Sequence, residues 1–414
     1  MHTRGLILIF ILSYTTLLNA QTQSNSFYSI YGLGVPQSTH LGLTEAMGGS
    51  GIALRPEYNL NTKNPAAMGS IERPFTFMLS TGFDVAATRN ENKDTDGLSI
   101  SGGLTHLDMW FRLSNKWTAS LGLMPATEVK YRIFSNRYYD PDGSPYQIFY
   151  EGSGGVNQFR FAQSFSPFKN FHLGAVGYLY FGSISKTENV NGITSAPQIL
   201  VETQSALSGF NYELGFQYSL PIGKSSFNIG ATYRPEIVLN SIQDYTLNSF
   251  AEILEGELDE EETYALPQQF IAGLAWQSPK LRIALDASLE EWSSLNNLGN
   301  TQINYQYEDV FGLNVGAEYA FFKYGYDSRL SATYLRAGVG VRNSYLQIDN
   351  SNFNIWNFSL GVGLPVTQSR NQLNLTYQYN HQGRISNDLV QEVTHSISFS
   401  FSLRDVWFTK RKFN

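Results

Sequence analysis

The sequence contains no cysteine, and beyond residue 20 it has no apolar run long enough for a membrane helix. Without thiols there are no disulfides, cysteine nucleophiles or thiolate metal ligands. Lys and Arg number 28 against 35 Asp and Glu, and no basic patch for nucleic acid is present. The histidines are scattered, without H-E-x-x-H or G-x-S-x-G spacing. We therefore expect a protein that is not an enzyme, needs no cofactor and binds no nucleic acid.

The first twenty residues have the order of a secretory signal. Arg4 precedes the apolar run Leu6 to Leu12, and the small residue Ala20 stands before Gln21. We expect residues 1–20 to be a signal peptide that is removed on export.

Apolar and polar residues alternate over about fourteen segments of the remaining chain. Between 393 and 403, for example, Ile397, Phe399 and Phe401 alternate with serines. Side chains two apart share a face of a strand, so each segment has one apolar and one polar face. An exported chain without membrane helices can satisfy its backbone in lipid only as a closed barrel. The pattern predicts an all-β fold, a 14-stranded antiparallel transmembrane β-barrel over residues 74–403.

The connections between these segments alternate in length. The odd-numbered ones span about 10 to 28 residues and the even-numbered ones about 3 to 9. Long outer loops and short periplasmic turns are typical of barrels in the outer membrane of Gram-negative-type bacteria. The even strand count places both ends of the barrel in the periplasm, with residues 404–414 as a short tail. The expected strands are 75–87, 98–113, 117–133, 155–166, 171–186, 205–220, 226–239, 268–277, 281–292, 309–320, 330–342, 354–364, 372–380 and 393–403.

The region between the signal peptide and the barrel lacks this alternation. Residues 21–73 are rich in Gly, Ala and Asn. A barrel of about fourteen strands is too wide for its own side chains to fill. We therefore expect residues 21–73 to form an N-terminal hatch that plugs the lumen.

Three short stretches of this region carry a family resemblance: 31–34 (YGLG), 46–54 (AMGGSGIAL) and 64–68 (NPAAM). Together with the strand count, they resemble the hatch of the FadL-type long-chain fatty-acid transporters of the outer membrane. The resemblance implies passive uptake of long-chain fatty acids or other hydrophobic compounds. From their chemistry, we expect the hatch motif residues either to pack the plug against the wall or to take part in gating. These residues are Gly48, Gly49, Gly51, Asn64, Pro65 and Ala66.

Pro125 interrupts the third expected strand, within Met124-Pro125-Ala126. Proline lacks the N–H that a barrel strand donates to its neighbour, so it forces a bulge or a local gap. In the resembling family a kink in the third strand opens a lateral passage, which makes Met124, Pro125 and Ala126 candidates for a lateral gate. The alternative is an ordinary bulge near the outer rim. Pro235 interrupts the seventh strand, and we interpret it as a position near the rim.

The polar faces of the strands carry more charge than filling requires. These charges can pair with each other and with the hatch, or an arginine can hold a fatty-acid carboxylate through its planar guanidinium. The arginines considered for that role are Arg132, Arg160, Arg234 and Arg336. The expected lumen charges are Asp108, Arg112, Glu128, Lys130, Arg132, Arg160, Glu213, Arg234, Arg282, Asp286, Glu290, Glu318, Arg336 and Arg342.

Two expected loops have distinctive compositions. Carboxylates between 252 and 262 alternate with apolar residues, which predicts a short helix and leaves a divalent cation site as an alternative to a solvated face. Residues 134–154 are rich in aromatics that could bind ligand or a partner protein. His106 and Asp108 are two apart, and we interpret them as a satisfied pair inside the barrel.

Two functions fit the sequence. The first is passive uptake of long-chain fatty acids or other hydrophobic compounds, with lateral release near the third strand. The second is a structural or accessory barrel subunit of a larger outer-membrane complex, since fold alone does not fix function. The expected partners are a hydrophobic ligand, outer-membrane lipid, the barrel-assembly machinery during biogenesis, or another outer-membrane protein.

Overall fold

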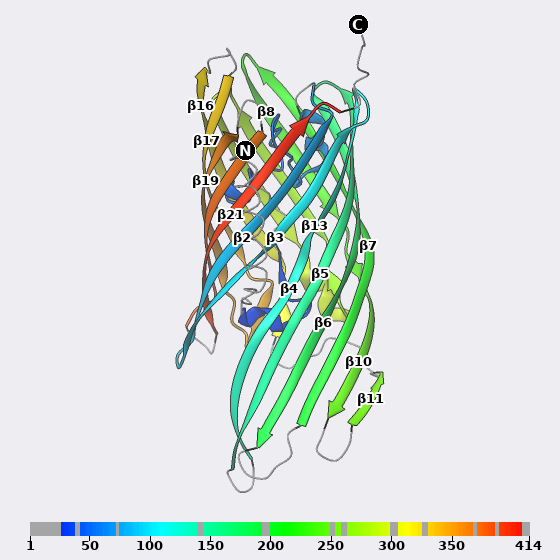
Figure 1. Cartoon of the computed structure of the whole chain (residues 1–414), viewed down its shortest axis with the longest axis vertical. Helices are drawn as coiled ribbons and strands as arrows, with labels where there is room; N and C mark the ends of the chain where they lie inside the picture. The colour runs from blue at the N-terminus through cyan, green and yellow to red at the C-terminus, as the bar shows by residue number, and fades with distance from the viewer. Residues whose placement is uncertain are drawn as a thin grey trace, which may run out of the picture.

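The fold is a closed antiparallel barrel of fourteen strands, as predicted (Figure 1). In this computed structural model the last strand pairs with the first along its length, from Phe77 opposite Asp405 to Glu91 opposite Gln391. The wall strands are β2 (Phe77–Glu91), β3 (Asp96–Arg112), β4 (Trp117–Tyr139), β5 (Ser144–Phe168), β6 (Phe171–Gly192), β7 (Ile199–Ile222), β8 (Ser225–Arg234), β13 (Gln269–Gln277), β14 (Leu281–Glu290), β16 (Val310–Tyr324), β17 (Leu330–Asn343), β19 (Asn354–Val366), β20 (Asn371–Gln382) and β21 (Gln391–Asp405).

The structure describes residues 26–37, 42–71, 74–139, 144–192, 199–248, 253–257, 263–298, 305–324, 330–366, 371–385 and 389–407. The expected signal peptide and most of the expected tail lie outside these ranges. Within them, no helix has the length and apolar character needed to cross a membrane.

The alternation in the sequence becomes an apolar outer face and a polar inner face. On β21, Ile397 and Phe399 are about half exposed, whereas Ser398 and Ser400 are buried inside the barrel. The exposed apolar side chains form the belt that an outer-membrane barrel presents to lipid.

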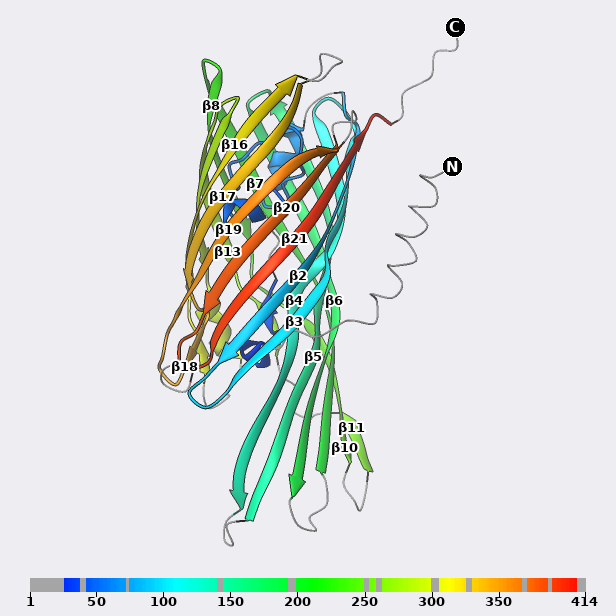
Figure 2. The same ribbon diagram turned by 60° about the vertical axis from the view of Figure 1, so that its left-hand side comes forward.

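Six strands form a sheet that projects beyond the closed barrel, at the lower end in Figures 1 and 2. β4 to β7 extend well past their apolar belts, and β10 (Asn240–Asn248) and β11 (Ile253–Glu257) continue the sheet beside β7. The expected loop 134–154 is therefore wrong, because most of it belongs to β4 and β5. The expected acidic helix is also wrong, because residues 253–257 pair with β10 as a strand. Both errors have one cause: beyond the lipid both faces of a strand contact water, and the alternation that marks a membrane strand fades.

A line of backbone distortions crosses the wall where this projecting sheet begins. The β4–β5 register shifts between Pro125 and Thr127, which leaves Ala126 as a bulge. On β5, Gly155 has φ 140°, and a Cβ there would lie against the carbonyl oxygen of Thr127. Only glycine adopts this backbone readily. Pro235, after the end of β8, separates β8 from β10. It lies where the pairing of β8 with β13 begins, at Arg234 opposite Gln269.

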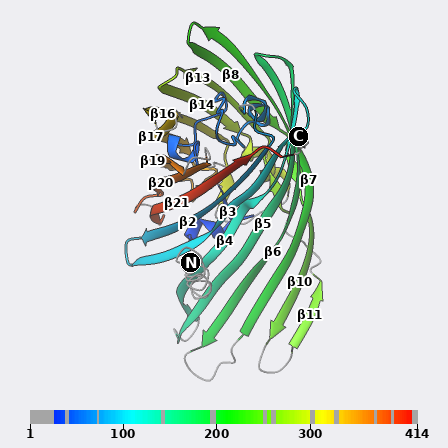
Figure 3. The ribbon, with the colours of Figure 1, turned by 45° about the horizontal axis from the view of Figure 1, so that its top comes forward.

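The N-terminal segments lie inside the ring of strands (Figure 3). They contain η1 (Phe27–Ile30), β1 (Val35–Pro36), η2 (Glu45–Met47) and η3 (Pro65–Ser70). Short elements gather near the outer end: η4 (Trp292–Leu298), β9 (Ile237–Val238) paired with β12 (Ala265–Leu266), and β15 (Tyr305–Tyr307) paired with β18 (Leu346–Ile348). Their side chains form an aromatic cap with η1, in which Trp292 stacks on Tyr345 and Tyr28 contacts Phe353.

Candidate functional site

Residues 42–71, called the plug below, are held to the barrel wall by a buried carboxylate. Asp286 on β14 is fully buried and accepts hydrogen bonds from the backbone N–H groups of Gly51 (2.7 Å) and Ile52 (3.1 Å). The Lys63 ammonium lies 2.9 Å from the same carboxylate and also donates to the carbonyl oxygen of Gly49. A buried charge is stable only when it is paired and hydrogen-bonded, and here both conditions are met.

Gly48 marks the closest approach of the plug to the wall. Its N–H donates to the Ser359 hydroxyl (2.7 Å) and its φ is 66°. A Cβ at this position would lie 2.5 Å from the backbone nitrogen of Val339 on β17. The residue therefore needs glycine for both its conformation and its contact.

The Asn64-Pro65-Ala66 motif fixes the start of η3. The Asn64 carboxamide oxygen accepts from the N–H of Ala66 (3.0 Å), and its amide group donates to the carbonyl oxygens of Ile52 and Phe216 (both 3.0 Å). Asparagine is a preferred N-cap and proline suits the first turn, where no donor is needed. The motif thus joins two parts of the plug to β7.

Two further ion networks line the plugged part of the lumen. Glu318 accepts from Arg282 (2.8 Å) and from Arg336 (2.7 Å), and Arg336 also donates to Asn374 (2.6 Å). Arg160 lies 3.6 Å from Asp108. Two of the predicted ligand arginines, Arg160 and Arg336, are therefore buried beside carboxylates of the wall.

The candidate site is the cavity that remains between the plug and the aromatic cap. Its volume is about 990 Å³. The lining combines charged side chains with apolar ones such as Tyr178, Ile271 and Trp292. The charged side chains favour water over an apolar ligand beside them. The charged residues at its surface are Glu45, Lys63, Asp84, Glu128, Lys130, Glu213, Arg234, Glu290, Arg342 and Glu392. Of the four predicted ligand arginines, only Arg234 lies at this cavity.

Glu45 is the plug's own carboxylate at this cavity. It accepts a hydrogen bond from the hydroxyl of Ser398 on β21. Burial raises its pKa to about 7, the nearby negative charge of Asp84 adds to the increase, and the Ser398 hydroxyl opposes it. The sequence did not point to Glu45 because the plug has no periodicity from which facing could be inferred.

The cavity reaches a gap in the wall between β3 and β4. The two strands pair only from Leu107 opposite Leu123 to Arg112 opposite Thr118. Beyond Leu123 they separate, and residues 101–105 on one side and 125–128 on the other line the cavity. The predicted gate residues Met124, Pro125 and Ala126 thus lie at the edge of this gap, and their role as a gate remains a prediction.

Residues 26–37, called the N-terminal segment below, cover part of this gap. β1 pairs with β4 at Val35 opposite Glu128 and Pro36 opposite Thr127. The N–H of Gln37 donates to the carbonyl oxygen of Ala126 (2.8 Å), and the N–H of Ser26 donates to that of Lys130 (2.9 Å). The segment therefore takes the place of β3 along this stretch of β4.

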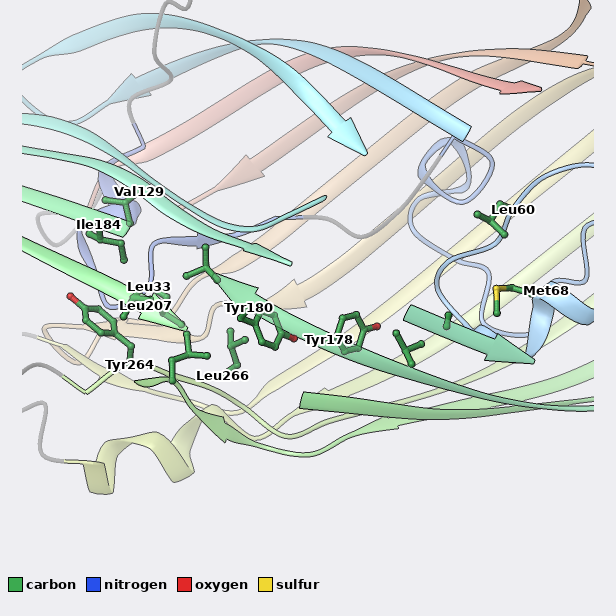
Figure 4. Packing of buried hydrophobic residues seen from close by; sticks show 14 of the residues in the cluster. Leu33, Leu60, Met68, Val129, Tyr178, Tyr180, Ile184, Leu207, Tyr264 and Leu266 are labelled. Carbon is green, nitrogen blue, oxygen red and sulfur yellow. The ribbon is translucent and has the colours of Figure 1, made fainter. Parts of the chain in front are cut away.

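The same segment also fills an apolar surface inside the outer half of the barrel. Leu33 packs with Leu266 against the inner face of β4 to β7, on the left in Figure 4, while Leu60 and Met68 of the plug lie on the right. Tyr178 and Tyr180 lie between the two groups. The buried residues around Leu33 are Val129, Tyr131, Val156, Ile184, Leu207, Leu239, Tyr264 and Leu266. The apolar surface that could hold a hydrophobic ligand is covered by the chain itself.

Arg132 does not lie in the lumen as the alternation predicted. Its side chain is 56% exposed and pairs with Glu151 (2.9 Å) on the projecting sheet. The bulge at Ala126 is the reason, because one extra residue exchanges the two faces of a strand. After it, Val129 and Tyr131 face inward.

His106 and Asp108 do not form a pair. His106 contacts the hydroxyls of Ser80 (3.1 Å) and Thr105 (3.0 Å), whereas Asp108 lies beside Arg160. Within the described residues no group of carboxylates and histidines is arranged to hold a metal ion. Asp259 and Glu260 to Glu262 of the acidic segment lie outside those residues.

Comparison with known proteins identifies the family. The sequence model of the BamG family matches residues 2–414, nearly the whole chain. The chain belongs to the BamG family. A search of curated proteins finds no match to this BamG-family sequence.

Solved structures share the barrel fold of this BamG-family member. The toluene transporter TbuX of Ralstonia pickettii is 15% identical over 88% of this chain and 97% of its own, with a TM-score of 0.61. A FadL homologue of Pseudomonas aeruginosa is 14% identical, covers 89% and 99%, and has a TM-score of 0.60. The monoaromatic hydrocarbon channel CymD is 15% identical, covers 91% and 98%, and has a TM-score of 0.54. The FadL-type resemblance is confirmed at the level of the fold.

Proposed function

We propose that this protein is an accessory barrel of a larger outer-membrane assembly. The observation that carries the proposal is the occupied lumen. The chain's own N-terminal segment covers the apolar surface of the outer half, buried ion pairs hold the plug, and the remaining cavity is lined with charge. A hydrophobic compound would have to displace water from those charges without replacing it, which is unfavourable. The name of the BamG family suggests the barrel-assembly machinery as the partner.

The projecting sheet offers an edge for such a partner. On β4, Ala126, Glu128 and Lys130 direct their backbone groups to the N-terminal segment. By the same alternation, Arg132 and Phe134 direct theirs to that edge, and no described strand pairs with β4 there. An edge that no described strand covers is a template for strand addition. We infer that an extended segment of the partner adds to β4 from Arg132 onward.

Site-specific photo-crosslinking tests this docking edge. A photoreactive residue in place of Phe134, whose side chain is 64% exposed, is expected to yield one discrete adduct with a barrel-assembly component in whole cells. The same residue in place of Leu360, exposed on β19 among the lipid-facing side chains, serves as the matched control and should yield none. Absence of an adduct at Phe134, or equal adducts at both positions, would refute docking at β4.

A second candidate, uptake of hydrophobic compounds with lateral release, is supported by the gap at Pro125 and by the fold shared with hydrocarbon channels. Cysteines in place of Val35 and Glu128, which face each other across β1 and β4, would lock the N-terminal segment over the gap. The chain has no other cysteine to interfere. If uptake is the function, oxidation should abolish entry of labelled toluene or hexadecanoate, and a reductant should restore it. The accessory proposal predicts no change.

A further inference from the structure

The four described short turns at the periplasmic end share a charge pattern. They are residues 113–116, 169–170, 223–224 and 278–280, and each contains one lysine and no acidic residue. All four lysines are exposed, and none lies within ion-pair distance of a described carboxylate. They are Lys116, Lys169, Lys224 and Lys280.

Because the four turns follow one another along the wall, their lysines form an arc on the periplasmic rim of the barrel. The turns join β3 to β4, β5 to β6, β7 to β8 and β13 to β14, which are eight consecutive strands of the wall. Successive turns are therefore two strands apart, about 10 to 13 Å along the rim. The arc lies on eight of the fourteen wall strands.

A large exposed apolar side chain accompanies each lysine. Trp117 follows Lys116, Phe168 precedes Lys169, Ile222 lies two residues before Lys224, and Trp276 lies four residues before Lys280. Their exposed fractions range from 36% to 73%, and they end the apolar belt on these strands. Aromatic and aliphatic side chains at the boundary of the belt, with a cation within one to four residues, place that cation at the level of the lipid headgroups.

The opposite end of the barrel has the opposite charge. Around the connection between β2 and β3, the carboxylates of Glu91, Asp94 and Asp96 outnumber the cations of Arg89 and Lys93. The connection after η4 contains Glu308 and Asp309. The net charge of the whole chain is -7, so the periplasmic arc is a local reversal of the protein's charge. A row of exposed lysines of this kind favours neighbouring molecules that carry negative charge.

We propose that this arc binds the phosphate groups of anionic phospholipids in the periplasmic leaflet of the outer membrane. The adjacent apolar residues favour a lipid over a soluble acidic protein, because they anchor the rim in the acyl region directly beside the cations. A lysine near an anionic lipid surface changes the binding constant about fivefold. The arc therefore makes the barrel select phosphatidylglycerol-type lipids over zwitterionic ones.

Native mass spectrometry of the intact barrel tests the proposal. The protein is extracted from vesicles of equal parts phosphatidylglycerol and phosphatidylcholine, and the retained lipids are counted. The wild type should retain phosphatidylglycerol at least about fivefold over phosphatidylcholine. The variant K116Q/K169Q/K224Q/K280Q should lose this preference. A control with the same change in charge at the other end, R89Q/K93Q/K186Q/R384Q, should keep it.

Heat-modifiable migration on gels first confirms that both variants are folded barrels. Inorganic phosphate added at millimolar concentration should leave the amount of retained lipid unchanged if intact lipid is the ligand. Displacement of the lipid by phosphate would show that free phosphate is enough to bind the arc. The proposal is overturned if the wild type shows no preference for phosphatidylglycerol, as expected of an arc that docks an acidic protein. It is also overturned if both variants lose the preference equally, because net charge would then be the cause.

Discussion

The two halves of the lumen differ in what fills them. In the periplasmic half the plug meets the wall through paired charges, as at Lys63 and Asp286, and its glycines touch the strands. In the outer half the chain covers an apolar surface with Leu33 and leaves a cavity with charged side chains in its lining beside a gap in the wall. Apart from the bulge at Ala126 and the gap between β3 and β4, the wall alternates in the same way in both halves. In this barrel the segments inside the lumen therefore differ between the halves: one is held by buried ion pairs, and the other leaves a cavity beside the gap.

The largest loss of stability is expected from removing Asp286, which holds the plug in the periplasmic half of the lumen. Asp286→Ala leaves the Lys63 ammonium buried without a counter-charge, which should cost about 3 to 5 kcal/mol. The free energy of unfolding, measured by urea titration in detergent, should fall by this amount. Amide exchange within residues 42–71 should accelerate more than in the wall strands.

The double variant Lys63→Met with Asp286→Leu is the control for this prediction. Replacing both charges with apolar groups of similar size should recover the part of the loss that comes from the buried ammonium, because no unpaired charge remains. The cost of the hydrogen bonds that Gly51 and Ile52 lose with Asp286 should remain. A single variant as stable as the wild type would show that the plug is not held by this pair.

The free energy of unfolding should depend on pH through Glu45, which lies at the boundary between the two halves of the lumen. Its pKa of about 7 in the folded protein exceeds the value of 4.5 expected when unfolded. The contribution of Glu45 to stability is therefore fully present below pH 4.5 and should be lost, by about 3 kcal/mol, as the pH rises through 7. Unfolding titrations at pH 4.5 and pH 8 should show this decrease in the wild type, and Glu45→Gln should reduce it. An unchanged pH dependence in the variant would assign it to other groups.

The bend at the start of the projecting sheet should depend on Gly155. Gly155→Ala adds a Cβ against the Thr127 carbonyl at a φ of 140°, so we expect a loss of about 2 kcal/mol. Gly103→Ala is the matched control, because a Cβ there meets nothing within 4 Å. Equal unfolding free energies for the two variants would contradict a strained bend.

The smallest change in the unfolding free energy is expected for a variant on the projecting sheet. Arg132 and Glu151 form an exposed pair, so Arg132→Ala should change the unfolding free energy by at most about 0.5 kcal/mol. Arg336→Ala, which leaves the buried Glu318 with one cation fewer, should cost several times more. Similar losses in both variants would remove the distinction between the sealed lumen and the solvated sheet.

The sequence predicts the wall well because lipid on one side and the lumen on the other impose a strict period of two. It fails where that constraint ends. Strands β4 and β5 extend into solvent without a marked period, and the bulge at Ala126 reverses the facing of Arg132. Pro125 was visible because proline cannot donate to a neighbouring strand. Lys63 and Glu45 were not, because their positions depend on long-range contacts of an aperiodic segment.

Native mass measurement of the protein after gentle detergent extraction from its own membrane tests the central claim most directly. The claim is that the lumen is occupied by the chain itself and that the barrel serves as a subunit. It predicts a complex containing a barrel-assembly component in fixed stoichiometry, with no apolar ligand retained in the barrel. A lone protomer that carries a fatty acid or hydrocarbon would contradict it.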